Sequence, residues 1–318
     1  MKVVALAGGT GGAKLAHGLQ AVLSPGDLHV IVNTGDDTER HGLVVMPDHD
    51  AVLYMLSGRF DDDRGWGISG ETWTVMDALA ELGEPTWFRL GDRDFATHIA
   101  RTARLREGST LTAAVLAIQD ALGIPTRILP MTDTSVPTQV RTDAGWLDFQ
   151  EYFVHQAQAP EVREIRFSGM GAALPTDEVT AALAAADVVI IGPSNPLVSV
   201  GPILAVPGMT DLLATARARD VPVIAVSGIV GGVALKGPAD RMLTSLGYES
   251  SARGVAAQYT EQIDGFVLDS VDTELEPSVA ALGLRTLVTD TIMADHAGRA
   301  RLAREVLAFA GTFRGAAP

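Results

Sequence analysis

Residues 1–19 read MKVVALAGGTGGAKLAHGL, and this stretch decides the fold. The apolar run of residues 3–7 is typical of a buried strand, and four glycines follow it within residues 8–12. Leu15 and Leu19 then stand four residues apart, which predicts a helix. A strand, a glycine-rich turn and a helix form the opening of a nucleotide-binding β-α-β unit. Backbone N–H groups in such a turn, together with the positive end of the helix dipole, favour a bound phosphate.

The glycine turn matches neither of the two best-known phosphate-binding patterns. A P-loop needs a Gly-Lys pair followed by Ser or Thr, whereas residues 13–15 are Ala-Lys-Leu. The dinucleotide pattern needs Gly or Ala where Lys14 stands. We therefore predict a phosphate-binding turn of another kind, and the alternative is a tight turn without a ligand. The predicted phosphate contacts in this turn are Gly9, Thr10, Gly11, Gly12 and Lys14.

Composition and charge place the chain among soluble proteins. Its 318 residues include 47% hydrophobic residues and no cysteine, which excludes a disulfide framework and thiolate chemistry. A net charge of −15 argues against a general nucleic-acid or membrane-surface binder. The N-terminus lacks the basic start of a signal peptide, and no apolar run is long enough to span a membrane. We therefore expect a cytoplasmic protein that binds neither nucleic acid nor membrane.

Acidic residues follow the second predicted strand, residues 28–32. Asp36 and Asp37 come shortly after it, and Asp48 and Asp50 stand near the start of a helix-like apolar run. In an open parallel sheet, ligands collect at the carboxyl ends of the strands. Several carboxylates gathered there are costly without a cation, and Mg²⁺ prefers oxygen ligands. We predict a Mg²⁺ site formed by Asp36, Asp37 and Asp50; the alternative is a solvated acidic loop whose side chains cap turns or helices.

Two further segments are predicted to end at the same edge of the sheet. Residues 87–90 are expected to form a short strand, and Arg89 could clamp a phosphate or pair with an acid in the following turn. The buried apolar run of residues 188–191 ends before Ser194 and Asn195. Prolines on both sides of this pair stiffen the turn, so that its polar groups can face a ligand; the alternative is a rigid connector.

Strand-like and helix-like segments alternate through most of the chain, which indicates an α/β fold with a Rossmann-like, mostly parallel sheet. Residues 138–142 alternate in polarity instead, and the turn that follows is typical of a hairpin. We predict an inserted antiparallel and helical substrate-binding region at residues 136–167, with residues 1–135 and 168–318 forming the nucleotide-binding core. Further strands are expected at residues 127–131, 223–226, 266–268 and 286–288, and helices at 109–122, 179–186, 211–219 and 295–309.

Several of these stretches occur together in one known family. Residues 8–15 (GGTGGAKL), 33–37 (NTGDD), 47–50 (PDHD), 90–98 (LGDRDFATH) and 193–196 (PSNP) resemble, in the same order, the CofD/FbiA family. This family comprises 2-phospho-L-lactate or phosphoenolpyruvate transferases of coenzyme F-420 biosynthesis. The likeness runs from Lys2 to about Asp295. One departure is Gly228, which stands where the family is expected to have proline.

The resemblance implies a specific reaction. A three-carbon acid, activated as a guanosine diphosphate derivative, donates its phosphate-linked group to the ribityl hydroxyl of the deazaflavin Fo, and GMP leaves. The family requires Mg²⁺, its substrates are small molecules, and its members are usually homodimers. The acid carried by the donor stays open among phospholactate, phosphoenolpyruvate and phosphoglycerate.

The resemblance also implies roles for individual residues. Asp50 and Arg89 are the expected contacts to Fo, and Asp50 and Asp36 are the expected catalytic residues. Gly9–Gly12 and the Ser194–Asn195 turn are expected to hold the guanosine diphosphate part of the donor. Under these assignments, Asp50→Asn or Arg89→Ala reduces turnover strongly while the fold survives.

Two other classes of protein are alternatives. A distant branch of the same superfamily resembles regulators of cell-wall metabolism that bind nucleotide sugars without catalysis. That branch shares the glycine turn but lacks the GDRD and PDxD stretches present here at residues 91–94 and 47–50. A dinucleotide-dependent oxidoreductase is the third class, and Lys14 in place of the third glycine argues against it.

Overall fold

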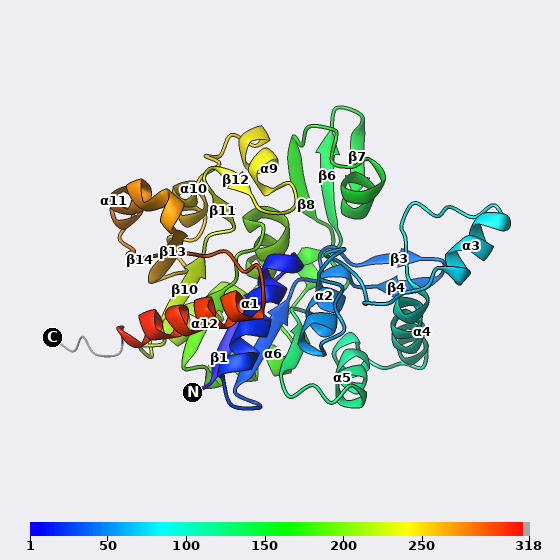
Figure 1. Cartoon of the computed structure of the whole chain (residues 1–318), viewed down its shortest axis with the longest axis horizontal. Coiled ribbons are helices and arrows are strands. Elements are labelled where there is room, and N and C mark those ends of the chain that lie inside the picture. The colour runs from blue at the N-terminus through cyan, green and yellow to red at the C-terminus, as the bar shows by residue number, and fades with distance from the viewer. Residues whose placement is uncertain (314–318) are drawn as a thin grey trace.

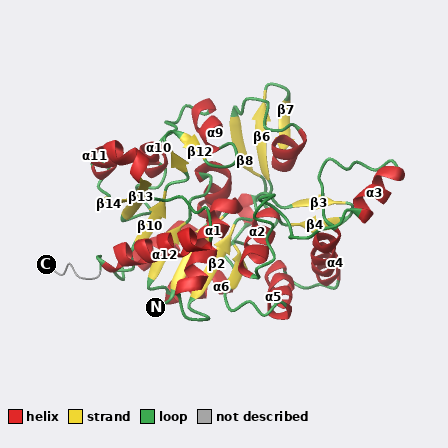
Figure 2. Ribbon diagram, viewed as in Figure 1, coloured by secondary structure: helices red, strands yellow, loops and turns green. Residues whose placement is uncertain are grey.

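A sheet of seven parallel strands forms the centre of the molecule, as Figure 1 and Figure 2 show. In the computed structural model, which describes residues 1–313, the strand order is β14-β13-β10-β9-β1-β2-β5. The order reverses beside β1, and such a switch point is where open α/β sheets bind their ligands. The strands are β1 (Val3–Ala7), β2 (Leu28–Val32), β5 (Arg127–Pro130), β9 (Val188–Ile191), β10 (Val223–Val226), β13 (Gly265–Asp269) and β14 (Arg285–Thr289).

Helices cover both faces of this sheet. Every residue of β1 is buried, as expected for a parallel strand between two helical layers. Successive side chains of a strand point to opposite faces, so Val3 and Ala5 pack in one hydrophobic cluster whereas Val4 and Leu6 pack in another. The first cluster includes α1 (Gly9–Val22), α2 (Pro47–Leu56), α5 (Leu111–Ala121) and α12 (His296–Gly311). The second includes α6 (Asp177–Ala185), α7 (Gly201–Ala205), α8 (Met209–Arg217), α9 (Ala239–Ser245), α10 (Ala252–Ala257) and α11 (Glu276–Ala280).

Two helices and three small antiparallel sheets surround this core. Helix α3 (Thr74–Glu81) and helix α4 (Asp92–Arg106) lie beyond α2, next to the β3–β4 hairpin in Figure 1. The small sheets are β3 (Thr38–Arg40) with β4 (Leu43–Val45), β11 (Ile229–Val230) with β12 (Val233–Ala234), and β6 (Thr138–Thr142) between β7 (Gly145–Asp148) and β8 (Glu164–Phe167). Short π and 3₁₀ turns are η1 (Glu151–His155), η2 (Met170–Ala172), η3 (Pro196–Val200) and η4 (Ser270–Leu275).

The α/β class and the Rossmann-like parallel sheet predicted from the sequence are confirmed. The hairpin predicted after residue 138 is also present, as β6 and β7, and β8 extends it within the range expected for the insertion. The division into a core at residues 1–135 and 168–318 and an insertion at 136–167 stays a prediction.

The strand predicted at residues 87–90 is wrong. These residues form a bend and irregular backbone, although their aromatic side chains favour a strand. The guanidinium of Arg40 lies over the rings of Trp87 and Phe88, and Leu90 is buried in a small cluster with Phe95. These side chains therefore pack against the β3–β4 hairpin and α4, and the segment does not pair with a strand.

Among residues 1–313, no single helix has both the length and the hydropathy of a membrane span. A pair of short helices, Pro196–Ala205 and Met209–Arg217, meets the length and composition test only when the two are joined, and they are bent by 84°.

Candidate active site

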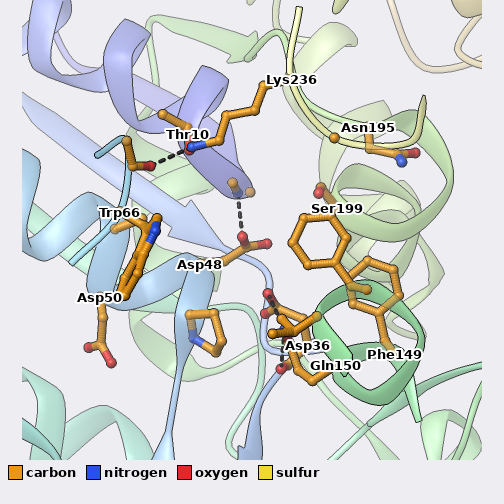
Figure 3. Close-up of a pocket in the computed structure, with 18 of the residues that line it drawn as sticks. Thr10, Asp36, Asp48, Asp50, Trp66, Phe149, Gln150, Asn195, Ser199 and Lys236 are labelled. Atoms are coloured by element: carbon orange, nitrogen blue, oxygen red, sulfur yellow. Dashed lines mark hydrogen bonds between the residues drawn. The ribbon is translucent and has the colours of Figure 1, made fainter. Parts of the chain in front are cut away.

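A cavity of about 580 Å³ opens at the carboxyl edge of the central sheet. Segments that follow β1, β2, β9 and β10 contribute to its wall, together with α2 and the loops before α4 and α9. Figure 3 shows how side chains from these distant parts of the chain point into one space. Its polar lining comprises Thr10, Asp36, Asp48, Asp50, Arg89, Asp94, His98, Gln150, Ser194, Asn195, Ser199 and Lys236.

The glycine turn packs so closely against the loop after β9 that larger residues do not fit. A Cβ atom on Gly11 would lie 2.1 Å from the carbonyl oxygen of Pro193, and one on Gly12 would lie 2.8 Å from Ser194 Oγ. Ser194 Oγ donates to the carbonyl oxygen of Gly8 at 2.6 Å. Because of this packing, the N-terminus of α1 points toward the cavity. The first N–H groups of a helix have no acceptor within the helix, so they can donate to other groups.

Two buried carboxyl groups, those of Asp36 and Asp48, face each other across the inner part of the cavity (Figure 3). Asp48 accepts hydrogen bonds from Gly9 N–H at 2.5 Å and from Asn33 Nδ2 at 2.9 Å. Burial raises the pKa of Asp48 to about 6, even though these donors lower it. Burial also raises the pKa of Asp36 well above its usual range, and the charge of Asp48 raises it further. Asp36 Oδ1 is buried and has no hydrogen-bond partner among residues 1–313.

This pair fits a divalent cation. A cation between the two groups would remove their repulsion and give the unpartnered oxygen of Asp36 a ligand, and hard cations such as Mg²⁺ take carboxylate oxygens. The predicted ligand Asp37 is half-buried, and the desolvation of its carboxyl group raises its pKa. Asp37 does not line the cavity, however, so Asp36 and Asp48 are the better-placed ligands.

Asp50, the third predicted metal ligand, has a different partner. Both of its carboxylate oxygens accept hydrogen bonds from the guanidinium of Arg101, which is completely buried. Burial alone would raise the pKa of Asp50, but the charge of Arg101 holds it well below its usual range. Asp50 therefore lines the cavity as a carboxylate paired with a buried guanidinium.

Asp50, Asp94 and His98 offer ligand atoms that lie within 4.8 Å of one another, an arrangement that can hold a metal ion. Two observations favour a protein-only network instead. Arg101 already neutralises Asp50, and a second cation beside its guanidinium would be repelled. Tyr54 donates to Asp94 Oδ1 at 2.5 Å, and His98 Nε2 lies 3.1 Å from the same oxygen.

The outer part of the cavity is apolar and aromatic. Phe149 and Phe153 stack with their ring planes 16° apart, and the lining also includes Trp66, Trp87 and Phe88. The predicted contact Arg89 lines the cavity too, and its guanidinium lies 4.3 Å from the centre of the Trp73 ring. Such a wall suits a planar ring system, because aromatic faces and guanidinium groups stack on planar molecules.

The structure brings most of the predicted site residues to one cavity. Its lining includes Gly9, Thr10, Gly11, Asp36, Asp50, Arg89, Ser194 and Asn195. Gly12 lies beneath Ser194 and outside the lining. Lys14 is outside it as well; burial and then Arg299 lower its pKa. Asn195 is engaged in the fold, since its side chain accepts from Leu197 N–H at 2.9 Å and caps η3.

Lys236 lines the cavity but was not predicted as a site residue. Its ammonium donates to Thr10 Oγ1 at 3.0 Å and to the carbonyl oxygen of Gly65. The sequence does indicate that Lys236 could lie near the site, because this lysine follows a second glycine-rich turn, Ser227–Gly232, after a buried strand. Asp48 lay within the predicted acidic group, but only the structure shows its bond to the glycine turn.

Comparisons with known proteins agree with this geometry. The model of the family described as 2-phospho-L-lactate transferase CofD matches residues 3–303. A phosphoenolpyruvate transferase of Kitasatospora aureofaciens is 41% identical over 99% of both chains. A 2-phospho-L-lactate transferase of Methanococcoides burtonii is 38% identical over 92% of this chain and 94% of its own. Protein BH3568 of Bacillus halodurans shares the fold, with a TM-score of 0.61 over 96% of this chain and 99% of its own, at 15% identity. A family match over nearly the whole chain and these two transferases establish that the chain belongs to the CofD family of transferases.

Proposed function

We propose that this chain moves a phospho-three-carbon-acid group from a guanosine diphosphate-activated donor to the ribityl hydroxyl of the deazaflavin Fo. The acid is phospholactate or phosphoenolpyruvate, the groups named for the two transferase relatives. The hydroxyl oxygen forms a bond to the phosphorus that carries the acid. The bond from that phosphorus to the GMP oxygen breaks, the hydroxyl proton is released, and GMP leaves.

One observation carries the proposal: a single cavity combines a helix N-terminus, a buried carboxylate pair and an aromatic outer wall. The N-terminus of α1 suits the diphosphate of the donor. The aromatic wall with Arg89 suits the tricyclic ring of Fo. Transfer between two phosphate esters needs positioning and charge neutralisation more than a protein nucleophile, and the cavity supplies both.

Different residues of the cavity would neutralise charge and position the two substrates. Asp36 and Asp48 would hold Mg²⁺, which when bound neutralises charge on the diphosphate. Asp50, which Arg101 holds and which lines the cavity, would accept a hydrogen bond from a ribityl hydroxyl and so orient the acceptor. The Ser194 backbone and the glycine turn enclose the donor from the other side. The homodimer expected from the resemblance and the cytoplasmic location expected from the composition stay predictions.

The direct test is a product assay. The protein is incubated with Fo, MgCl₂ and, in separate reactions, the guanylated forms of phospholactate, phosphoenolpyruvate and phosphoglycerate, and the products are weighed by mass spectrometry. We expect one donor to yield the corresponding Fo phosphodiester together with GMP in equal amount. The proposal fails if neither guanylated phospholactate nor guanylated phosphoenolpyruvate gives a phosphodiester of Fo while the protein is folded and supplied with Mg²⁺.

A further inference from the structure

Lys236 joins three segments that are far apart in the sequence. It follows the β11–β12 hairpin, and its ammonium donates to Thr10 Oγ1 in the glycine turn and to the carbonyl oxygen of Gly65. The loop that contains Gly65 also carries Trp66, a lining residue that is 40% exposed. Figure 3 shows the Lys236 side chain extending toward Thr10, near the N-terminal end of α1.

Lys236 has no acidic partner among the residues that the structure describes. Within residues 1–313, no carboxylate forms an ion pair with it, and both of its hydrogen-bond acceptors are neutral oxygens. Partial burial lowers its pKa, and the nearby charge of Lys14 lowers it further. The chain has only three lysines, and Lys2 by contrast pairs with Asp27 at the opposite, amino-terminal end of β1.

The surroundings of this ammonium favour an anion. Thr10 is the second residue of α1, so the ammonium lies beside the positive end of a 14-residue helix. Lys14, one turn further along the same helix, adds a second positive charge. The acidic groups Asp36 and Asp48 also line the cavity, and Asp48 accepts a hydrogen bond from Gly9 N–H, the neighbour of Thr10. A metal ion bound by these two carboxylates would separate their charge from that of a bound phosphate.

We infer that Lys236 is a donor-binding residue whose ammonium binds the diphosphate of the nucleotide substrate. The inference rests on the proposed function, since it takes the diphosphate of that donor as the anion. In the complex, the ammonium exchanges one of its neutral acceptors for a phosphate oxygen. Because it also holds Gly65, the same residue keeps the Trp66 loop over the donor while the acceptor reacts.

The test measures anion binding directly, in the presence of Mg²⁺, by isothermal titration calorimetry. The probes are inorganic pyrophosphate, GDP and, as the uncharged comparison, guanosine. Lys236→Gln keeps the ability to donate to Thr10 and Gly65 but removes the charge, whereas Lys236→Arg keeps the charge. Lys2→Gln is the matched control, because it removes a lysine that lies far from the cavity.

Charge-assisted hydrogen bonds to phosphate are roughly twice as strong as neutral ones. We therefore expect Lys236→Gln to weaken the binding of pyrophosphate and GDP by about tenfold or more, with guanosine binding unchanged. The affinity of Lys236→Arg for both anions should lie within a few-fold of the wild-type value. The affinity of Lys2→Gln should equal the wild-type value. Raising the salt concentration should weaken anion binding more in the wild type than in Lys236→Gln.

Unchanged anion affinity in Lys236→Gln overturns the inference, and so does an equal loss for guanosine, which would show that the lysine only ties loops together. A wild type that binds neither pyrophosphate nor GDP overturns it as well. The product assay separates this outcome from the proposed function. Product formation with full anion affinity in Lys236→Gln removes the lysine assignment alone; pyrophosphate binding through Lys236 without any product removes the transferase assignment alone.

Discussion

Arg101 Nη1 donates to Asp50 Oδ2 at 3.1 Å, while Nη2 of the same guanidinium donates to Asp50 Oδ1. The Arg101 side chain is completely buried and that of Asp50 is 6% exposed. This ion pair joins α4 to α2 immediately behind the cavity wall. Asp50 therefore has a structural partner in addition to any substrate it contacts.

Removing Arg101 should destabilise the protein strongly. Arg101→Met leaves the Asp50 carboxylate buried without a partner, and breaking a buried pair typically costs about 3–5 kcal/mol of unfolding free energy. Asp50→Asn should also reduce stability, although the protein is still expected to fold. Urea denaturation of the two single variants and of Arg101→Met/Asp50→Asn measures the coupling. Simple addition of the two losses would contradict a direct pair.

The position of Asp50 could be predicted from the sequence, but its partner Arg101 could not. Residues 47–50 were predicted to lie at the ligand edge of the sheet, and they do, because the carboxyl ends of parallel strands meet at one edge. The partner Arg101 lies 51 positions away on α4, and its helix periodicity gave no reason to single it out. The assignment of Asp50 as a metal ligand stays a prediction, and the structure adds Arg101 as its partner within the chain.

Elsewhere in the molecule too, local sequence pattern predicts some elements, whereas contacts between distant residues decide others. Runs such as Val188–Ile191 and Val223–Val226 are buried on both faces, so their sequence alone specifies strands of a parallel sheet. The run of residues 87–90 has strand-forming side chains but folds as a bend and irregular backbone, because its side chains pack against Arg40 and Phe95 instead of a neighbouring strand. Local pattern decides an element only where tertiary contacts do not compete with it.

Arg89→Ala should impair catalysis without harming the fold. Its side chain lines the cavity and stacks on Trp73, and surface substitutions usually change stability by less than about 0.5 kcal/mol. We expect a raised KM for Fo with little change in the KM for the donor, measured by steady-state kinetics. Arg93→Ala is the matched control, since Arg93 bonds to the Ser69 carbonyl oxygen and lies outside the cavity lining. Equal kinetic effects in both variants would argue against a role of Arg89 in acceptor binding.

Mg²⁺ should stabilise the folded protein through Asp36 and Asp48. A ligand that binds only the folded state at 100 times its Kd adds about 2.7 kcal/mol of stability. Differential scanning fluorimetry should show a rise in Tm with MgCl₂ that EDTA reverses. Asp36→Asn and Asp48→Asn should each reduce this rise, while the surface variant Asp120→Asn, whose side chain is 62% exposed, should retain it. A full Mg²⁺ response in both cavity variants would place the ion elsewhere.

Gly11→Ala should disrupt the glycine turn. The added Cβ would lie 2.1 Å from the carbonyl oxygen of Pro193, so the turn and the loop after β9 must separate. Such overpacking costs roughly 1–3 kcal/mol, and the displaced N–H groups should also weaken GDP binding in calorimetry. Gly311→Ala is the control: a Cβ there meets no atom within 4 Å, and alanine is a better helix former than glycine. Equal stability of the two variants would contradict the close packing of the turn.

His17 should make stability depend on pH below neutrality. Its ring packs edge-on against His296, with ring centres 4.7 Å apart, and its Nδ1 is buried without a hydrogen-bond partner among residues 1–313. Burial, followed by the charge of Arg299, lowers the pKa of His17 from 6.5 to about 4, although Asp62 opposes the shift. The unfolded chain therefore binds a proton between about pH 6.5 and pH 4 that the folded chain does not.

By linkage, this histidine contributes stability above pH 6.5 that is lost as the pH falls toward 4. His17→Gln removes the titrating group, so the variant should gain stability relative to the wild type between pH 7 and pH 4.5. Urea midpoints at pH 7 and pH 4.5 measure the difference in stability between the variant and the wild type. The buried carboxyl groups are the same in both proteins, so their contribution cancels in this difference. His155→Gln, which alters a histidine with a side chain 50% exposed, should show a much smaller relative gain. A His17→Gln variant that loses stability in parallel with the wild type would mean that the ring is protonated as easily in the folded chain as in the unfolded one.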